Sequence, residues 1–398
     1  MSKIKVDHVY KIFGDDPETA LKMLNEGASK AEIQEKTGQV VGVNDASFNV
    51  EEGEIFVIMG LSGSGKSTVV RLLNRLIDPT FGTVEVDGED ITSMDEDQLR
   101  QLRSRKMSMV FQRFALFPHR TVVENASYGL EVHRLPLEER TQRGSEALKR
   151  VGLEGWDNNY PGQLSGGMQQ RVGLARALAV DSDIMLMDEA FSALDPLIRR
   201  EMQDQLLELQ SELKKTIVFI THDLNEAMKL GDHIAVMRDG AIVQIGTAEE
   251  ILTTPADDYV ASFIEDVDRT RVIVASSIMR WPRETVNPHD GPSVALRKMK
   301  EAQLSQCLVM ESNRKVVGVV REDDVVRLSR ERAGSIEAVI DDSVPRSKPE
   351  TPIAELYAAA AETSVPIVVE NEDGRMMGIV PRISLLAALS GEDGTNDS

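Results

Sequence analysis

The stretch that most constrains the fold is residues 60–68, which read GLSGSGKST and follow the apolar run 55–59. A buried strand that enters a glycine-rich turn and leaves as a helix points several backbone N–H groups at one place, where the positive end of the helix dipole also lies. The pattern GxxxxGK[ST] is typical of phosphate-binding loops. The sequence therefore predicts an α/β nucleotide-binding domain, with a chance glycine turn as the alternative.

The residue types of this loop suit a phosphate ligand. Glycines let the backbone approach closely, Lys66 can reach the β- and γ-phosphates, and the Ser67 hydroxyl can bind Mg²⁺. We therefore expect a nucleotide site that also holds Mg²⁺. Its candidate residues in the loop are Gly60, Ser62, Gly63, Ser64, Gly65, Lys66, Ser67 and Thr68.

Polar residues follow three other apolar runs, at the edge where open α/β sheets place their ligands. These are Gln112 after 107–111, Asp188 and Glu189 after 184–187, and His222 after 216–220. A carboxylate at the end of an apolar run suggests that a cation or a reacting water needs it. Asp188 is expected to hold Mg²⁺ through water with Ser67 and Gln112, and Glu189 to polarise the attacking water. His222 is expected to contact phosphate, or else to be a satisfied core histidine.

A second small-residue turn, QLSGGMQQR at residues 163–171, leads into the apolar run 172–179. We expect a helix there, whose N-terminus is a second place suited to an anion. Ser165, Gly166, Gly167 and Gln169 are its candidate binding residues, and Asp195 ends a further turn that begins at residue 192.

Taken together, these motifs resemble the ATPase subunit of ABC transporters, in that family's order, across about the first 265 residues. The resemblance implies an ABC-type domain with a helical subdomain at about 113–162. It also implies a homodimer that pairs head to tail, in which Lys66 of one copy and Ser165 of the other bind the same ATP. Phe13 matches the aromatic residue that stacks on adenine. Met168 departs from the family's signature, which has glutamine there, and is expected to tune activity.

Residues 15–38 interrupt the domain with an insert. Asp16 before Pro17, and the capping box of Ser29 with Glu32, predict a helical hairpin. We expect either a solvated surface element or a contact with protein or lipid. The insert and the residues around the motifs resemble glycine betaine/proline-type osmoprotectant importers. That resemblance implies uptake of a quaternary amine through membrane-spanning permease subunits, with a substrate-binding protein or domain.

The last third of the chain contains a repeat, in which each unit is a hairpin followed by an apolar helix, with Gly318 and Gly378 in corresponding places. It resembles a tandem pair of CBS domains. We expect a linker at 266–275, repeats at 276–334 and 335–390, and a disordered acidic tail at 391–398. Asp324 fits the family's ribose-contacting pattern. However, the residues that depart from it (Arg321, Pro381 and Ser384) favour a cyclic dinucleotide or an ionic-strength response over simple AMP binding.

Bulk composition narrows the partners and the location. The 398 residues carry a net charge of −21, which excludes a general attraction to nucleic acid. Cys307 is the single cysteine, so no intrachain disulfide is expected, and a reducing compartment fits. No apolar run is long enough to span a membrane. These features fit the cytoplasm, and the resemblance to importers implies a location at the cytoplasmic face of the cell membrane, through the permease.

Three other functions stay open at this point. One is a soluble ABC ATPase of nucleic-acid repair or translation, which the single cassette and the acidic charge disfavour. Another is an importer ATPase for a different polar solute. In the third, the chain is primarily a sensor whose ATPase is subordinate to the repeat.

Overall fold

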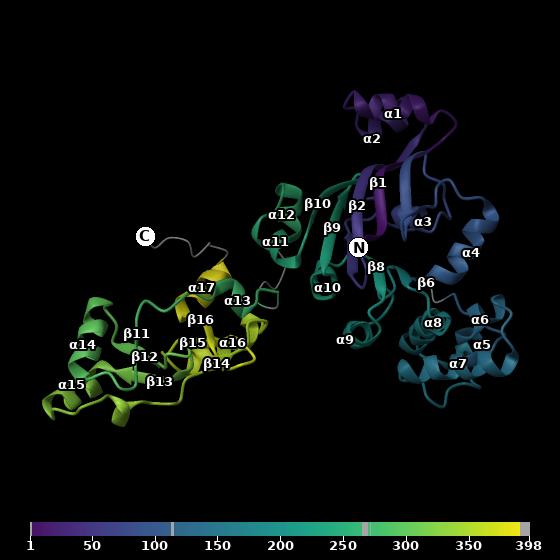
Figure 1. Ribbon diagram of the computed structural model, residues 1–398. Helices are drawn as coiled ribbons and strands as arrows, with labels where there is room; N and C mark the ends of the chain where they lie inside the picture. The colour runs from purple at the N-terminus through teal and green to yellow at the C-terminus, as the bar shows by residue number, and fades with distance from the viewer. Residues whose placement is uncertain (1, 113–114, 265–269, 271, 391–398) are drawn as a thin grey trace. The chain divides into compact units, whose positions relative to one another are not determined.

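The computed structural model describes residues 2–112, 115–264, 270 and 272–390 (Figure 1). The chain divides into two compact units, Met1–Val267 and Asp268–Ser398. Each unit is described on its own. The predicted tail at 391–398 lies outside the described residues, and the finer predicted boundaries between linker and repeats stay predictions.

The first unit is built on a six-stranded sheet of order β10-β9-β3-β8-β7-β6, with all neighbours parallel except β10 and β9. Every residue of β3 and β8 is buried, which explains why these strands read as unbroken apolar runs. The strands are β3 (Ile55–Met59), β6 (Met107–Phe111), β7 (Ile184–Asp188), β8 (Thr216–Thr221), β9 (His233–Arg238) and β10 (Ala241–Gly246).

A second, antiparallel sheet of order β2-β1-β4-β5 shares one hydrophobic core with the first. Phe48 of β2 stacks on Phe56 of β3, with ring centroids 5.0 Å apart. β2 extends beyond the alternating residues 46–50, and its buried side chains continue at Val43 and Val41. The strands are β1 (Ser2–Phe13), β2 (Val40–Glu51), β4 (Phe81–Val86) and β5 (Glu89–Asp90).

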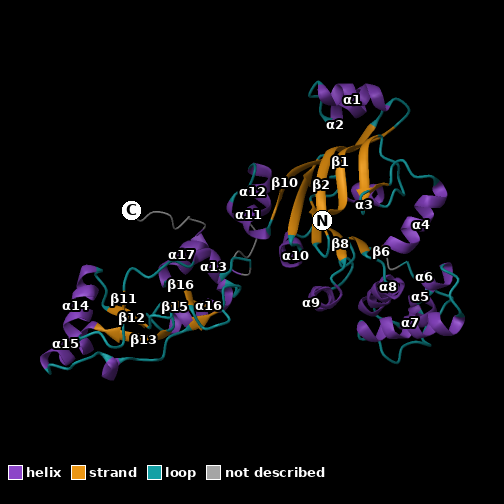
Figure 2. Ribbon diagram, viewed as in Figure 1, coloured by secondary structure: helices purple, strands orange, loops and turns teal. Residues whose placement is uncertain are grey.

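Helices surround the parallel sheet and form a separate group after β6 (Figure 2). The group holds α5 (Val122–Ala126), α6 (Tyr128–Val132), α7 (Leu137–Arg150) and α8 (Gly166–Val180), with a short η1 (Pro161–Gln163) before α8. α8 begins earlier than its apolar run indicates, because Ser165 caps it at Met168 N. The remaining helices of this unit are α3 (Lys66–Leu73), α4 (Glu96–Lys106), α9 (Pro196–Leu213), α10 (Leu224–Leu230), α11 (Ala248–Thr253) and α12 (Asp258–Ile264).

The insert after β1 is a helical hairpin of α1 (Pro17–Asn25) and α2 (Lys30–Thr37). Asp16 caps α1, and Ser29 forms the predicted capping box with Glu32. Ala20 and Ile33 pack in a small core with residues of β1 and β2. The hairpin is therefore anchored to the antiparallel sheet through one apolar face.

The second unit contains two three-stranded sheets, one in each repeat. A core that includes Leu308, Val319, Val368 and Ile379 joins the repeats, as expected for units that bury their sheet faces against each other. The first sheet has β11 (Thr285–Val286), β12 (Gln306–Met310) and β13 (Val316–Arg321), and the second has β14 (Arg346–Ser347), β15 (Ile367–Glu370) and β16 (Met376–Val380). The helices are α13 (Ala275–Ile278), α14 (Pro292–Glu301), α15 (Glu322–Arg330), η3 (Glu337–Val339), α16 (Ile353–Glu362) and α17 (Arg382–Ser390).

The segment before the first repeat packs on the second repeat. Ile273 and Ala275, which fall within the predicted linker, are buried in the core that holds Ile353 and Leu385. Arg280 and Ile379 then form an isolated antiparallel bridge. Ordered structure therefore reaches further toward the N-terminus of this unit than the sequence pattern indicates.

Among the residues that the structure describes, no helix has both the length and the apolar character needed to cross a bilayer.

The two repeat glycines should respond differently to a methyl group. A Cβ at Gly318 would lie 2.4 Å from the Asp341 carbonyl oxygen, whereas one at Gly378 would meet only the Met279 side chain, at 3.1 Å or more. Backbone cannot yield as a methionine can. We expect Gly318→Ala to lower the free energy of unfolding of this unit by about 1–3 kcal/mol, and Gly378→Ala by less than about 1 kcal/mol. Urea unfolding of the full chain measures both, and equal losses would contradict the assigned packing.

Candidate active site

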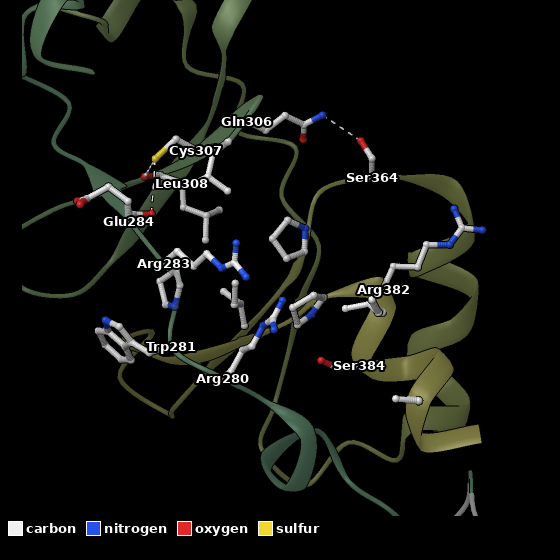
Figure 3. A pocket seen from close by; sticks show the side chains of 17 residues that line it. Arg280, Trp281, Arg283, Glu284, Gln306, Cys307, Leu308, Ser364, Arg382 and Ser384 are labelled. Atoms are coloured by element: carbon white, nitrogen blue, oxygen red, sulfur yellow. Dashed lines mark hydrogen bonds between the residues drawn. The ribbon is translucent and has the colours of Figure 1, made fainter. Parts of the chain in front are cut away.

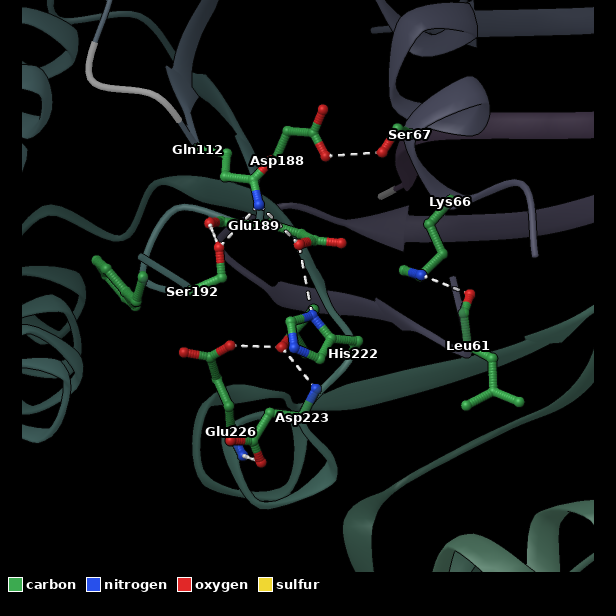
Figure 4. Close-up of polar contacts among 12 residues, drawn as sticks. Leu61, Lys66, Ser67, Gln112, Asp188, Glu189, Ser192, His222, Asp223 and Glu226 are labelled. Carbon is green, nitrogen blue, oxygen red and sulfur yellow. Dashed lines mark hydrogen bonds and ion pairs between the residues drawn. The ribbon is translucent and has the colours of Figure 1, made fainter. Parts of the chain in front are cut away.

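The phosphate-binding loop connects β3 to α3 (Figure 4). Gly60 has φ 150°, and a Cβ there would lie 2.3 Å from the Met237 carbonyl oxygen, so only glycine fits. Lys66 is buried and donates to the carbonyls of Gly60 at 2.8 Å and Leu61 at 3.0 Å. Burial lowers the pKa of Lys66, while the nearby carboxylates of Glu189 and Asp188 oppose that shift. The loop thus already holds its lysine at its centre.

The other loop residues surround this lysine. Ser62 and Gly63 are exposed at the tip of the loop. Ser64 is buried, and its carbonyl accepts from the Gly240 N–H at 2.9 Å, which ties the loop to the β9–β10 turn. Gly65 adopts φ 105° as the N-cap of α3, and Thr68 lies in the first turn of that helix. These residues keep their predicted places around one point.

The candidate metal ligands meet between α3 and β7. Ser67 Oγ donates to Asp188 Oδ1 at 3.0 Å. Burial raises the pKa of Asp188, and the hydrogen bond from Ser67 opposes that rise. A hydroxyl beside a carboxylate suits Mg²⁺, which takes a few protein oxygens and completes its shell with phosphates and water. In the described ranges no group of three or more His, Cys, Asp or Glu forms a protein-only metal cage.

The structure brings Gln112, Glu189 and His222 together at the ends of β6, β7 and β8. Glu189 Oε2 accepts from Gln112 Nε2 at 3.2 Å and lies 3.4 Å from His222 Nδ1. Gln112 Nε2 also donates to Ser192 Oγ at 3.1 Å, and that hydroxyl donates to the Glu189 carbonyl at 2.9 Å. Glu189 itself has φ 46°, so the chain turns sharply there. His222 is about half exposed, which argues against the core-histidine interpretation.

The second predicted anion site is the N-terminus of α8. Ser165 and Gly166 are exposed, and Ser165 Oγ accepts from Met168 N at 3.3 Å. The Gln169 amide donates to the carbonyls of Pro161 and Leu164 at 3.1 and 3.2 Å, and its role in nucleotide binding stays a prediction. Gln169 therefore fixes the turn before the helix in this chain.

Asp195 has a structural task of its own. Its carboxylate caps α9 and accepts from the N–H groups of Leu197 and Ile198, each at 3.2 Å. Phe13 ends β1 and is 39% exposed, as a base-stacking ring requires. The nucleotide-contacting roles of both residues stay predictions.

Gly42 is a residue that the sequence analysis missed. A Cβ there would lie 2.8 Å from Phe13 Cε2 and 3.3 Å from Thr68 Cγ2, so the Phe13 ring rests on this glycine beside α3. The available signal was a glycine inside a strand of branched residues, which often marks a close approach. Gly42 thereby places the aromatic ring next to the phosphate-binding loop.

The parallel sheet, the phosphate-binding loop and the polar residues at its carboxyl edge define an ATPase of the ABC transporter class. The ABC transporter family profile matches residues 43–192, and the CBS domain profile matches 274–331 and 336–391. The chain belongs to the family of ABC transporter ATP-binding subunits that carry a C-terminal CBS pair. This result confirms the predicted fold class and the predicted ATPase activity.

Curated relatives match along nearly the whole chain. The glycine betaine/carnitine transport ATP-binding protein GbuA of Listeria monocytogenes is 54% identical over 99% of this chain and 99% of its own length. The glycine betaine transport ATP-binding protein OpuAA of Bacillus subtilis is 52% identical over 99% of this chain and 96% of its own length. A solved dimeric structure of a bacterial ABC transporter cassette is 34% identical, with TM-score 0.53, over 62% of this chain and 98% of that one.

A second candidate site is a cavity of about 590 Å³ between the repeats of the second unit (Figure 3). The guanidinium groups of Arg280 and Arg283 project into it, while that of Arg382 points away. Pro381 and Ser384, which depart from the ribose-contacting pattern, line the cavity. Asp324 is absent from its lining and pairs with Arg327 at 3.0 Å. Three arginines and one glutamate, Glu284, therefore line the cavity, while Pro381 and Ser384 stand where the ribose-contacting pattern has other polar residues.

Cys307 lies in the wall of this cavity. It is buried, and burial raises the pKa of its thiol to about 11. Its sulfur lies 3.5 Å from the Glu284 carbonyl oxygen. The thiol therefore stays protonated and packs as a small hydrophobe.

We expect the Asp188 carboxylate to lower the free energy of unfolding when no nucleotide is bound. Its pKa is raised, so the folded protein disfavours the carboxylate relative to the unfolded chain; the free energy of unfolding falls as the pH rises from the ordinary aspartate pKa to the raised one, and the full loss is present above the raised pKa. We expect Asp188→Asn to raise the melting temperature at pH 7, by an amount that vanishes as the pH falls through the pKa of Asp188. The same variant should lose the extra stabilisation that Mg²⁺ adds to ATP.

Asp90→Asn is the matched control, because the shift there has the opposite sign. Burial of Asp90 opposes ionisation, but hydrogen bonds from Thr92 and Ser93 outweigh it and lower the pKa. That substitution should lower the melting temperature at pH 7. Thermal unfolding across pH measures both variants. A lower melting temperature of the Asp188→Asn protein at pH 7 would show that the ionised Asp188 carboxylate does not destabilise the fold.

Proposed function

We propose that the chain is the ATP-hydrolysing subunit of an ABC importer that takes up a quaternary-amine osmolyte of the glycine betaine or proline betaine type. The observation that carries this proposal is the convergence of Gln112, Glu189 and His222 beside the Ser67–Asp188 pair. The solute class follows from the names of the relatives, which match over the full chain. An importer for another polar solute is the alternative, because the ATPase does not touch the solute.

The site residues have distinct roles in this proposal. Lys66 and the loop N–H groups hold the β- and γ-phosphates, while Ser67 and Asp188, with Gln112 nearby, hold Mg²⁺. Mg²⁺ would neutralise phosphate charge. Glu189 orients and polarises the attacking water, and His222 contacts the γ-phosphate. Because the Gln112 amide donates a hydrogen bond to Glu189, a movement of the Glu189 carboxylate would also move this amide.

A second copy of the chain completes the site in this proposal. The exposed tip at Ser165 and Gly166 presents a helix N-terminus to a ligand outside its own chain. Head-to-tail pairing would place this tip over ATP bound to Lys66 of the other copy. The homologous cassette with a solved structure is dimeric. Closure on ATP and reopening after hydrolysis would then convert differential binding into motion.

The membrane partner would dock beside Gln112. A mostly apolar cavity of about 420 Å³ lies between β6 and the helical group, and its lining includes Phe111, Phe117, Val132, His133 and Arg176. Phe111 and Val132 are exposed at its edge. An apolar helix of a permease fits this cavity, and Gln112 follows Phe111 directly. The chain would thus act at the cytoplasmic face of the membrane through its permease.

The test is uptake by the full chain, purified with its membrane partner and reconstituted into vesicles with ATP inside. Glycine betaine uptake should accompany ATP hydrolysis and compete with proline betaine. Glu189→Gln should still bind ATP but hydrolyse it about 100-fold or more slowly, with uptake lost in parallel. Wild-type turnover by this variant would remove the role of Glu189. Robust hydrolysis coupled only to another solute would replace the substrate assignment.

We further propose that the CBS pair regulates transport by sensing ionic strength, an adenine or cyclic dinucleotide, or both. The support is the cavity with Arg280 and Arg283, because arginine is well suited to bind phosphate. The residues that depart from the ribose-contacting pattern favour a ligand with more phosphate contacts than AMP offers. Screening by salt would weaken any such contact.

The regulatory role predicts separable effects of two changes. Removing residues 265–398 should give transport that no longer responds to ionic strength, because the sensing unit is gone. Arg280→Gln with Arg283→Gln should abolish the effect of cyclic di-AMP on transport, whereas Arg297→Gln, an exposed arginine of α14, should not. Transport rates at varied salt and dinucleotide measure both. Unchanged regulation in the truncated chain would contradict the proposal, and lost transport by a folded truncated chain would favour the sensor-first alternative.

A further inference from the structure

Arg199 lies in the first turn of α9 and contacts four acceptors with one guanidinium group. Nε donates to the Phe191 carbonyl at 3.2 Å, and Nη2 donates to the carbonyls of Ser192 at 3.3 Å and Leu194 at 3.1 Å. Nη1 donates to Asp223 Oδ2 at 3.5 Å. A planar fork with several N–H groups can bridge two separate segments in this way, whereas a lysine cannot.

The two segments that Arg199 joins both carry residues of the candidate active site. The carbonyls belong to the turn that follows Glu189, and Ser192 in that turn also hydrogen-bonds to Gln112. Asp223 follows His222 directly, and its other carboxylate oxygen caps α10 through Asn225 N at 2.9 Å. Arg199 therefore connects the backbone behind Glu189 to the residue beside His222.

Besides Arg199, the register of β7 on β8 and the contact between the Phe191 and Phe219 rings, whose centroids are 5.5 Å apart, join the two segments, but neither reaches the Glu189 and His222 side chains. Both residues lie beyond the ends of their strands, where the ladder of β7 and β8 has stopped. Their direct contact, 3.4 Å from Glu189 Oε2 to His222 Nδ1, is long for a hydrogen bond to a carboxylate. One backbone bond, from Glu189 N to the Ile220 carbonyl at 3.1 Å, reaches across.

The position of Arg199 is unfavourable for α9 alone. A positive charge in the first turn opposes the helix dipole, which favours acidic residues there. The side chain is only partly exposed and is directed at carbonyls outside the helix. The contacts of Arg199 with the two segments outside α9, and not the stability of α9 itself, therefore explain why an arginine stands at this position.

We propose that Arg199 is a positioning residue for ATP hydrolysis, which clamps the turn after Glu189 to Asp223 and so holds Glu189 and His222 at their working separation. It touches neither of those two side chains and acts through the backbone and Asp223. The inference rests on the roles proposed above for Glu189 and His222.

The test compares four variants of the full chain by kcat and KM for ATP and by thermal unfolding. Misplacing a catalytic group by a fraction of an ångström is costly, so Arg199→Met should lower kcat about 10-fold or more and change KM less than about 2-fold. Arg199→Lys should recover part of this loss, because it keeps the charge. Asp223→Asn should also lower kcat while retaining the cap of α10. Arg200→Met, at the exposed neighbour, should hydrolyse ATP like the wild type.

A double variant separates the clamp from general destabilisation. If Arg199 and Asp223 act through one contact, Arg199→Met with Asp223→Asn should be within about 2-fold of Arg199→Met alone. Fully multiplicative losses, an effect on KM only, or a kcat that falls only in proportion to the folded fraction would overturn the proposal. Wild-type hydrolysis by Glu189→Gln would instead overturn the role of Glu189, so the two failures are distinguishable.

Discussion

The register of the parallel sheet is the constraint on which the site depends. Phe111 pairs with Asp188, Asp188 with Ile220, and Met59 with Thr221, so four strands end at one level. The residues that follow those ends therefore meet, although they lie far apart in the sequence. A slip of one residue in β7 would turn Asp188 to the opposite face of the sheet and separate it from Ser67. The buried apolar runs make such a slip costly, and in this way hydrophobic packing fixes polar geometry.

The same site carries charges that the fold alone does not favour. Burial lowers the pKa of Lys66 and raises that of Asp188, because the loss of hydration disfavours the ionised form of each side chain. Protein contacts offset this only in part: the carboxylates of Glu189 and Asp188 do so for Lys66, and the Ser67 hydroxyl does so for Asp188. Phosphates and a metal ion would supply the missing opposite charges. Ligand binding would therefore recover electrostatic free energy that folding loses at this loop. Such a coupling suits a subunit that changes state with its nucleotide.

The sequence sufficed where structure is local or where a pattern repeats. Strand ends, the capped hairpin at 15–38 and the polar edge residues follow from apolar runs, caps and known loop chemistry. It did not suffice where a contact joins distant segments. Gly42 supports Phe13, and Arg199 bridges two loops. Each depends on which backbone lies opposite, and no periodicity encodes that.

The two CBS repeats have similar sequence patterns but different structural surroundings. Arg280, near the start of the first repeat, bridges Ile379 in the second, and Asp341, near the start of the second repeat, bridges Val319 in the first. The sheet of each repeat thus gains a backbone bridge from the N-terminal segment of the other. Arg280 makes one of these crossings with its backbone while its side chain enters the cavity. An anion bound in this cavity would contact Arg280, whose backbone bridges the two repeats. Binding there would therefore affect how the repeats are arranged.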